Sequence, residues 1–360
     1  MKKNIMKVNL SKDAKYNLIT IAAIIVVYAM CQIMIAAGMM SYLMKGLLVP
    51  FCYYSILAVS LNLTVGILGE LSLGQAGFMC IGAFASAFFS KCTINLIPNT
   101  FIRFTLAIFV GALAAAIFGM FIGVAVLRLR GDYLAIVTLA FGEIIKNVLN
   151  TIFVGYDSKG FHFSLKDAAS LKLQGDGTLI INGPQGITGT PQDTNFTVST
   201  LLLIATFIIV ANLINSRSGR AIMAIRDNRI AAEAMGIDVT KFRILAFTIT
   251  AALAGVAGVL YAHNISSLNA TPKNFGYNMS IMILVFVVLG GIGNIRGSII
   301  ASVILTLLPE YLRFLQDYRM LIYAIVLIIM MILNWNPTCI AWRKKYSLGS
   351  IFRKKTQGEV

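Results

Sequence analysis

The chain has few charged residues and few of the side chains from which catalytic and metal sites are built. Charged residues make up 12% of the 360 positions, and only two histidines are present. The five cysteines are scattered with no CxxC pair, so the sequence indicates neither a disulfide framework nor a zinc site. It also lacks a GxxxxGK[ST] phosphate loop, an HExxH motif and a GxSxG motif. We therefore expect no ATP-binding P-loop, no metal, no cofactor and no catalytic centre in this chain.

Apolar residues, by contrast, are abundant. They make up 58% of the chain, and the mean hydropathy is +0.83, whereas soluble domains contain about 45–50% apolar residues. Crossing the ~30 Å hydrocarbon core of a bilayer takes about 20 apolar residues in a helix. Ten stretches of this kind are present, some short or interrupted: residues 17–37, 46–65, 74–90, 101–127, 132–154, 196–214, 243–262, 278–292, 297–312 and 319–336. The sequence predicts an all-α, polytopic transmembrane bundle of about ten spans, with eight to ten as the range.

The basic residues predict the orientation of this bundle. An even number of spans places both tails on one side, and 20 of the 30 lysines and arginines fall on that side. The positive-inside rule therefore predicts a cytoplasmic basic tail over residues 1–16, a transmembrane domain over 17–336 and a second cytoplasmic tail over 337–360. An odd number of spans would separate the two basic tails. Because topology accounts for the net charge of +16, we expect the lipid bilayer as a partner and no nucleic acid.

One connection between spans, residues 215–242, is strongly charged. It carries four arginines, which are Arg217, Arg220, Arg226 and Arg229. Such a segment belongs in water, and its arginines place it in the cytoplasm. It also offers small and soft apolar side chains at Ala231, Ala232, Ala234 and Met235, with Gly236 as the C-terminal stop of a short helix. A helix of this kind suits a groove on another protein; the alternative is a loop that only joins two spans.

The connection over residues 155–195 is far longer than a simple link between two helices requires. It contains NGPQGITGTP, in which glycines and proline mark turns. On the predicted topology it lies outside the cell. The segment either receives a partner on the outer face or serves as a solvated spacer.

Two apolar stretches are interrupted by glycine and polar residues, Gly66–Ala87 and Val288–Gly297. Small residues allow helices to pack closely, and glycines also permit unwound backbone beside a transport path. Both interpretations remain open. The candidate path residues are Ser72, Gly74, Gln75, Gly77, Glu143, Gly293 and Asn294.

Glu143 differs from the other candidates because it carries a charge within a predicted span. Lys146 lies three residues further on and therefore on the same helical face. An unpaired carboxylate at this depth is costly, so we expect Glu143 to face the bundle interior with Lys146 as its partner. A structural ion pair and a residue of the transport path are both possible.

Taken together, these motifs resemble one family. The stretches that carry the resemblance are SLGQAGFMCIGA, LRLRGDYLAIVTLAFGEIIKNV, NGPQGIT, GRAIMAIRDNRIAAEAMGIDVTKFRILAFTITAALAGVAG and VLGGIGNIRGS. Their order and spacing are similar to those of the permease subunits of branched-chain amino-acid ABC importers, specifically the LivM type. The similarity extends over about residues 45–315, and the charged segment with its following span is the most specific part.

The resemblance implies a heteromeric importer in the plasma or inner membrane. Its parts would be this chain, a paralogous permease subunit, two cytoplasmic ABC ATPases and an extracytoplasmic substrate-binding protein. ATP hydrolysis would occur on partner subunits, so the chain is not itself an enzyme. The implied ATPase-coupling residues are Arg226, Asp227, Ala231, Ala232, Glu233, Ala234, Met235 and Gly236. The binding protein would dock beside Asn182, Gly183, Pro184 and Gly186.

The chain also departs from the family pattern. It has Asn182-Gly183-Pro184 where Gly-Gly-Pro is common, and Pro337-Thr338-Cys339-Ile340 where Pro-x-Gly-Leu is usual. These departures leave open a scaffold that carries urea, amides, nucleosides or sugars instead of branched-chain or related amino acids. A different class of protein, an ion-coupled secondary transporter in which Glu143 titrates, is a further alternative.

Overall fold

The structure is a computed structural model that describes residues 12–94, 96–126, 131–157, 160–171 and 177–312, together with 318, 321–322, 324–325, 327–329 and 332. The chain divides into two compact units, Met1–Val303 and Ile304–Val360. The predicted sites lie in the first unit. The predicted tail over residues 337–360 lies outside the described residues, as do most of the tail over 1–16 and much of the predicted span over 319–336.

Helices dominate the described part of the chain. Their bounds are α1 Lys12–Ala36, α2 Tyr42–Asn62, α3 Gln75–Cys92, α4 Thr100–Val126, α5 Asp132–Thr151, α6 Phe196–Asn215, α7 Arg217–Asp227, α8 Arg229–Ala234, α9 Val239–Ala262, α10 Pro272–Phe275, α11 Tyr277–Gly290 and α12 Ile295–Tyr311. A π-helix, η1 Leu63–Leu68, continues α2 directly.

Within the described residues, seven helical stretches are long and apolar enough to cross a membrane. They are Tyr16–Ala36, Tyr42–Leu68, Thr100–Ala125, Tyr133–Thr151, Phe196–Asn215, Val239–Ala262 and Pro272–Gly290. Each coincides with a predicted span. The predicted spans over 74–90 and 297–312 correspond to α3 and α12, which have only 18 and 17 residues. The number of ten spans therefore stays a prediction, while a mostly helical chain with seven candidate spans in its described part is confirmed.

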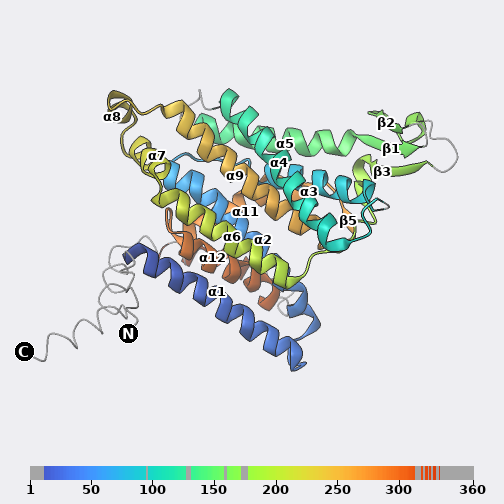
Figure 1. Cartoon of the computed structure of the whole chain (residues 1–360), viewed down its shortest axis with the longest axis horizontal. Coiled ribbons are helices and arrows are strands. Elements are labelled where there is room, and N and C mark those ends of the chain that lie inside the picture. The colour runs from blue at the N-terminus through green and yellow to red at the C-terminus, as the bar shows by residue number, and fades with distance from the viewer. Residues whose placement is uncertain are drawn as a thin grey trace, which may run out of the picture. The chain divides into compact units, whose positions relative to one another are not determined.

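The long helix α9 runs through the middle of the first unit and packs against α2, α3 and α4 (Figure 1). Glycines bring these helices together. A Cβ atom built on Gly82 of α3 would lie 2.4 Å from the Cα atom of Gly255 in α9, and one built on Gly258 would lie 2.1 Å from the carbonyl oxygen of Met79. Part of the glycine-rich stretch Gly66–Ala87 thus serves close helix packing, one of the two interpretations of its sequence.

The expectation of an all-α chain is wrong for the long connection after α5. Strands β1 Phe153–Asp157, β2 Gly160–Ser164 and β3 Thr178–Asn182 form an antiparallel sheet in the order β2-β1-β3. Two further short strands, β4 Ile187–Thr188 and β5 Ser267–Leu268, pair with each other. Aromatic and β-branched residues in these strands favour a sheet. The connection therefore has a fold of its own, and the sheet lies at the end of α9 opposite to α7 and α8 (Figure 1).

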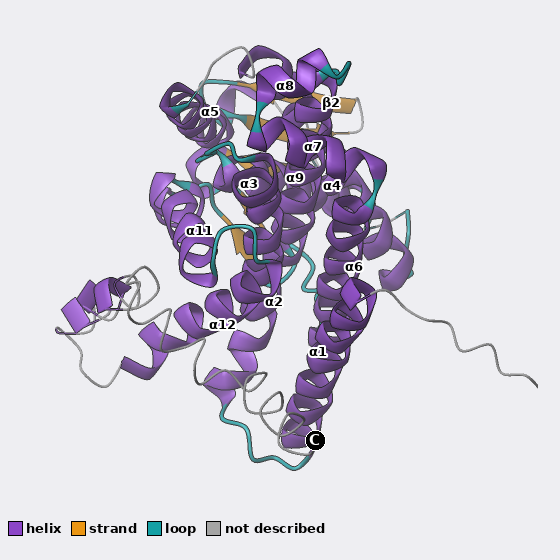
Figure 2. Cartoon of the chain, turned by 90° about the vertical axis from the view of Figure 1, so that its left-hand side faces the viewer, coloured by secondary structure: helices purple, strands orange, loops and turns teal. Residues whose placement is uncertain are grey.

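Helix α1 lies beside α6 (Figure 2). The contact is made by Tyr28, whose ring lies 5.3 Å from that of Phe196 and whose hydroxyl lies 3.0 Å from the Oγ1 atom of Thr197. Most apolar side chains of α1 are exposed within this chain. An apolar face of this kind suits lipid or another membrane subunit.

We predict that Gly82→Ala lowers the thermal unfolding midpoint of the purified protein by several degrees. The new methyl group would press on the backbone of α9, and overpacking of this kind costs about 1–3 kcal/mol. Gly46→Ala in α2 is the control, because a Cβ atom built there has no neighbour within 4 Å. Thermal unfolding in one detergent compares the two variants, and equal midpoints would contradict the packing account.

Candidate functional site

The charged segment forms two short helices, α7 and α8, with a side-chain cap at the start of each. Ser216 Oγ accepts a hydrogen bond from the Gly219 amide at 3.1 Å, and Asn228 Oδ1 accepts one from the Ala231 amide at 3.1 Å. Gly236 ends α8 with a φ of +81°. The amides of Gly236 and Ile237 donate to the carbonyls of Glu233 and Ala232, as in a Schellman motif. The predicted stop at Gly236 is confirmed, whereas Asn228 as a second cap was not anticipated.

The two helices have an inner and an outer face. Ile225 of α7 packs with Ala232 of α8 and Val239 of α9. Ala232 is therefore only 4% exposed, and it differs in this respect from the other small residues predicted to dock on a partner. The most exposed apolar side chains are Ile230 (79%) and Met235 (82%). Met235 is among the residues predicted from the sequence, whereas Ile230 is not.

A cavity of about 650 Å³ lies where this segment meets η1, the start of α5 and α9. Its lining includes Gly69, Glu70, Arg226, Arg229 and Arg243. Glu70 and Arg243 form an ion pair whose side chains are mostly buried. Burial raises the pKa of the Glu70 carboxyl, and the hydrogen bond from Arg243 opposes that rise. The cavity is thus bordered by charged groups that are held in pairs.

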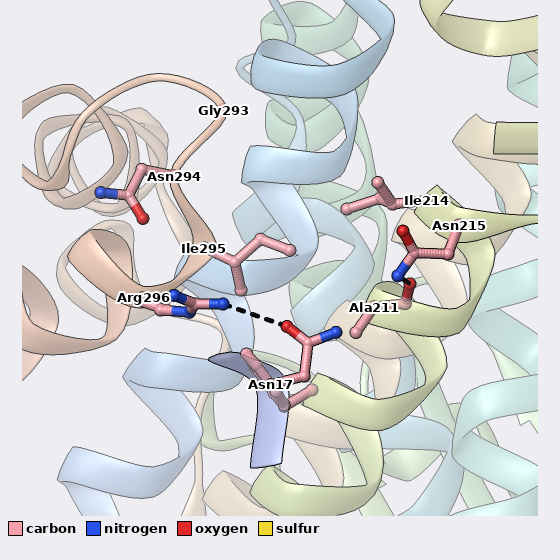
Figure 3. Close-up of a pocket in the computed structure, with 9 residues that line it drawn as sticks. Asn17, Ala211, Ile214, Asn215, Gly293, Asn294, Ile295 and Arg296 are labelled. Carbon is pink, nitrogen blue, oxygen red and sulfur yellow. Dashed lines mark hydrogen bonds between the residues drawn. The ribbon is translucent and has the colours of Figure 1, made fainter. Parts of the chain in front are cut away.

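A second cavity of about 300 Å³ lies between α1, α6 and α12 (Figure 3). Gly293 and Asn294, two predicted path residues, contribute to its lining. Asn17 and Arg296 close one side through a hydrogen bond of 3.2 Å from Arg296 Nη2 to Asn17 Oδ1.

The path residues predicted at the start of α3 form buried contacts instead. Gln75 Nε2 donates to Ser60 Oγ of α2. A Cβ atom built on Gly74 would lie 2.8 Å from the Thr138 carbonyl oxygen, and one built on Gly77 would lie 2.7 Å from the Cα atom of Gly142. Neither of the two cavities, as far as described residues define them, includes Ser72, Gly74, Gln75 or Gly77.

Glu143 has two partners. It forms the predicted ion pair with Lys146, and its Oε1 atom accepts a hydrogen bond from the Tyr277 amide at 2.7 Å. Tyr277 is the first residue of α11, and an amide at this position has no acceptor within its own helix. Glu143 therefore caps α11 from α5. This contact favours the structural interpretation of Glu143.

At the other end of α9, the residues predicted to receive the binding protein form a tight turn. Asn182 ends β3, and Gly183–Gln185 form a 3-10 turn. Gly183 and Gly186 are buried and have φ values of +46° and +67°. Both glycines therefore shape the turn through their backbone conformation and offer no side chain to a partner. The exposed positions of the turn are Pro184 and Gln185. Any partner at this turn would meet those two side chains first.

At this end of α9, where His263 follows the helix, lies a buried charged cluster that was not predicted from the sequence. Arg103 Nη2 lies 3.0 Å from Asp193 Oδ2, and His263 Nδ1 lies 3.8 Å from the same oxygen. His263 Nδ1 also lies 3.1 Å from the Pro191 carbonyl oxygen, which can only accept, so the nitrogen donates. The cluster connects the start of α4 and the segment before α6 to the end of α9. Because these residues are far apart in the chain, no local motif signals them.

Burial lowers the pKa of His263 to about 4, against the opposing effects of Asp193 and the Pro191 carbonyl. An unfolded histidine titrates near 6.5, so the unfolded state binds more protons than the folded state between pH 6.5 and pH 4. The stabilisation that neutral His263 contributes is therefore complete above pH 6.5 and is lost as the pH falls towards 4.

We predict that the His263→Gln variant, which keeps a donor to Pro191 but does not titrate, loses less free energy of unfolding between pH 6.5 and pH 4 than the parent protein. The difference between variant and parent is about 3 kcal/mol at most, and denaturant unfolding across a pH series measures it. If the free energies of unfolding of the two proteins change in parallel with pH, the prediction is wrong.

Comparison with known proteins places these features in a family. The family described as branched-chain amino acid transport system / permease component matches residues 43–331. The high-affinity branched-chain amino acid transport system permease protein LivM of Salmonella typhimurium is 35% identical over 296 residues, and that of Escherichia coli K12 is 34% identical. The ribose import permease protein RbsC of Escherichia coli K12 is 29% identical over 127 residues, which cover 33% of this chain and 39% of RbsC.

The alignment to both LivM proteins covers 79% of this chain and 66% of theirs, so the chain spans just under two thirds of their length. No solved structure shows significant similarity to the chain. The family match nevertheless includes α2 to α12, both interrupted stretches and the α7–α8 segment. The chain is thus an integral membrane protein, and it belongs to the family of permease components of branched-chain amino acid transport systems.

Proposed function

We propose that this chain is the permease subunit of an ATP-binding-cassette importer that moves branched-chain or related amino acids inward. The observation that carries the proposal is the 34–35% identity to two LivM permeases over 79% of the chain. In this proposal separate ATPase subunits supply the energy. An external binding protein delivers the substrate.

The distribution of charge supports an orientation with α7 and α8 in the cytoplasm. This end of α9 carries Arg226, Arg229 and Arg243, and basic loops face the cytoplasm in membrane proteins. The sheet at the opposite end then lies outside the cell. Both tails, over residues 1–16 and 337–360, are cytoplasmic on this topology.

We assign ATPase docking to the exposed face of the α7–α8 segment. Ile230 and Met235 are exposed apolar side chains, whereas Ile222 and Ile225 of the same segment are buried. Arg229 and Glu233 form an exposed ion pair of 3.1 Å beside them. Helices that dock in a groove usually bury a few apolar side chains at the centre of the contact and carry charged side chains around them. Ala232 does not take part, because it packs inward.

The outer face would receive the binding protein at the turn that contains Pro184 and Gln185. A rigid turn suits docking, because a preorganised surface loses little conformational freedom on binding. Asn182 Nδ2 donates to Gln185 Oε1 at 2.6 Å, and the Gly183 amide donates to the Ile152 carbonyl at 3.0 Å. A paralogous permease would complete the translocation path.

Transport on this account is alternating access. Closure of the two ATPases on ATP would move the α7–α8 segments of the two permeases. Groups of helices would then rock and expose the path to the other side of the membrane. The driving force is the higher affinity of ATP for the closed ATPase pair, since a ligand shifts an equilibrium only by its differential binding.

Other cargoes remain the second candidate. RbsC, named for ribose import, matches a third of the chain at 29% identity. The alignment to LivM is longer and has a higher sequence identity, which favours branched-chain amino acids as the cargo. An ion-coupled carrier that uses Glu143 is disfavoured, because Lys146 and the Tyr277 amide occupy this carboxylate in a capping contact.

We predict that the tagged chain, purified from its native membrane in mild detergent, retains a P-loop ATPase and a second, similar permease. Mass spectrometry of the retained proteins identifies both. Repeated recovery of the folded chain alone would contradict the proposal and favour a self-sufficient carrier.

Ile230→Asp is predicted to reduce the retained ATPase at least about tenfold, because a carboxylate is costly to bury in an apolar groove. Phe163→Asp is the matched control, since Phe163 is similarly exposed but lies on β2 at the other end of α9. Quantitative mass spectrometry compares the ATPase recovered with each variant. Equal losses in the two variants, or no loss in Ile230→Asp, would exclude docking at this face.

A further inference from the structure

We propose that Arg226 transmits movement of the α7–α8 segment into the membrane by holding the π-helix η1. This inference rests on the proposed function, because it assigns to Arg226 a step between ATPase docking and opening of the path. Among the residues that the family resemblance implies for ATPase coupling, Arg226 would act towards the bundle, as a positioning residue.

The first contact is a hydrogen bond to a backbone carbonyl. Arg226 Nη1 donates to the Gly66 carbonyl oxygen at 3.0 Å. Gly66 lies in the last turn of η1, where carbonyls lack a donor from their own helix. The amides of Gly69 and Glu70, which follow this turn, both donate to Thr64. A guanidinium is a strong donor for a carbonyl at such a helix end.

The second contact is steric. Gly69 ends η1 with a φ of +79°, and a Cβ atom built there would lie 2.5 Å from Cγ of Arg226. The aliphatic part of the arginine therefore lies directly against this glycine. Arg226 contacts η1 at two points, the Gly66 carbonyl and the Gly69 backbone, so a displacement of the arginine displaces the end of η1.

Asp227 fixes the direction of the guanidinium. Arg226 Nε and Nη2 both donate to Asp227 Oδ1, at 3.1 Å and 3.0 Å. These two nitrogens form one edge of the planar group, which leaves Nη1 for Gly66. A lysine has no such fork and is not held in one direction in this way. The Arg226 side chain is 39% exposed, so the contact lies at the border between the segment and the bundle.

From η1 the connection continues to the second interrupted stretch. Asn62, directly before η1, accepts a hydrogen bond from the Gly293 amide at 2.8 Å and donates to Ser298 Oγ at 2.8 Å. A Cβ atom built on Gly66 would lie 2.4 Å from the Gly293 nitrogen. The end of η1 is thus packed onto the turn between α11 and α12. Gly293 of that turn borders the cavity of Figure 3.

Apolar packing alone would not provide this coupling. Ile222 of α7 is buried in a cluster with Leu63, Ile67 and Leu68 of η1. Apolar contacts of this kind attach the segment but are non-directional, so they tolerate sliding. The hydrogen bond from Arg226 is directional and sets the position of α7 against η1. π-Helical turns often occur at functional sites, and the turn that receives Arg226 is of this type.

The test measures uptake of labelled leucine, isoleucine and valine and hydrolysis of ATP in the same proteoliposomes, made from the native complex with its binding protein. In Arg226→Gln and Arg226→Lys we expect the ATPase subunits to stay bound at parental amounts. The ratio of uptake to ATP hydrolysed should fall at least about tenfold, since a charge-assisted contact with fixed geometry is lost. The control is Arg220→Gln, an exposed arginine of α7 whose Nη1 atom donates to the Asn215 carbonyl and not to η1. This variant should stay within about twofold of the parent.

A second pair of variants approaches the contact from the other side. Gly69→Ala displaces Arg226, and we expect it to lower the same ratio at least about fivefold. Gly38→Ala has a comparable φ of +69° and no neighbour within 4 Å, so it controls for backbone strain and should leave the ratio unchanged.

Three results would overturn the proposal. Loss of ATPase subunits from Arg226→Gln would make Arg226 a docking residue. A parental ratio in both Arg226 variants would show that the contact transmits nothing. A parent complex whose uptake does not depend on ATP would overturn the proposed function, and with it any role for Arg226 in transmission.

Discussion

Backbone groups at an interrupted helix need hydrogen-bond partners, and this constraint governs two places where the described helices break. At the first, η1, the guanidinium of Arg226 meets the free carbonyl of Gly66. At the second, the turn between α11 and α12, the side chain of Asn62 meets the amide of Gly293. Each break is satisfied by a side chain from a distant part of the chain. The breaks therefore hold α7, η1 and the start of α12 in one arrangement.

This arrangement has a functional consequence. The end of η1 keeps this hydrogen bond only while Arg226 stays in place, so a movement of α7 has to move η1 or leave the Gly66 carbonyl without its donor. The cost of exposing that group makes the segment and the bundle move together. At the other end of α9, the buried cluster of Arg103, Asp193 and His263 holds the outer sheet to the helices. In the proposed importer, the outer end presents a rigid surface and the inner end transmits movement.

The sequence predicts those features that depend on local chemistry. Hydrophobic run length located the spanning helices, and a glycine after a short helix identified Gly236 as its stop. The spacing of Glu143 and Lys146 predicted their ion pair. Features set by tertiary packing could not be found in this way. Composition could not show that Ala232 faces inward while Ile230 faces out, because this depends on packing against Ile225 and Val239. The π-helix and its contacts depend on residues 160 and 231 positions apart.

The most direct test of the account compares energy sources for uptake of branched-chain amino acids by the reconstituted complex. For an ATP-driven importer we predict that uptake requires ATP on the side of α7 and α8 and persists when proton and sodium gradients are abolished. Uptake by this chain alone, driven by an ion gradient and indifferent to ATP, would contradict it.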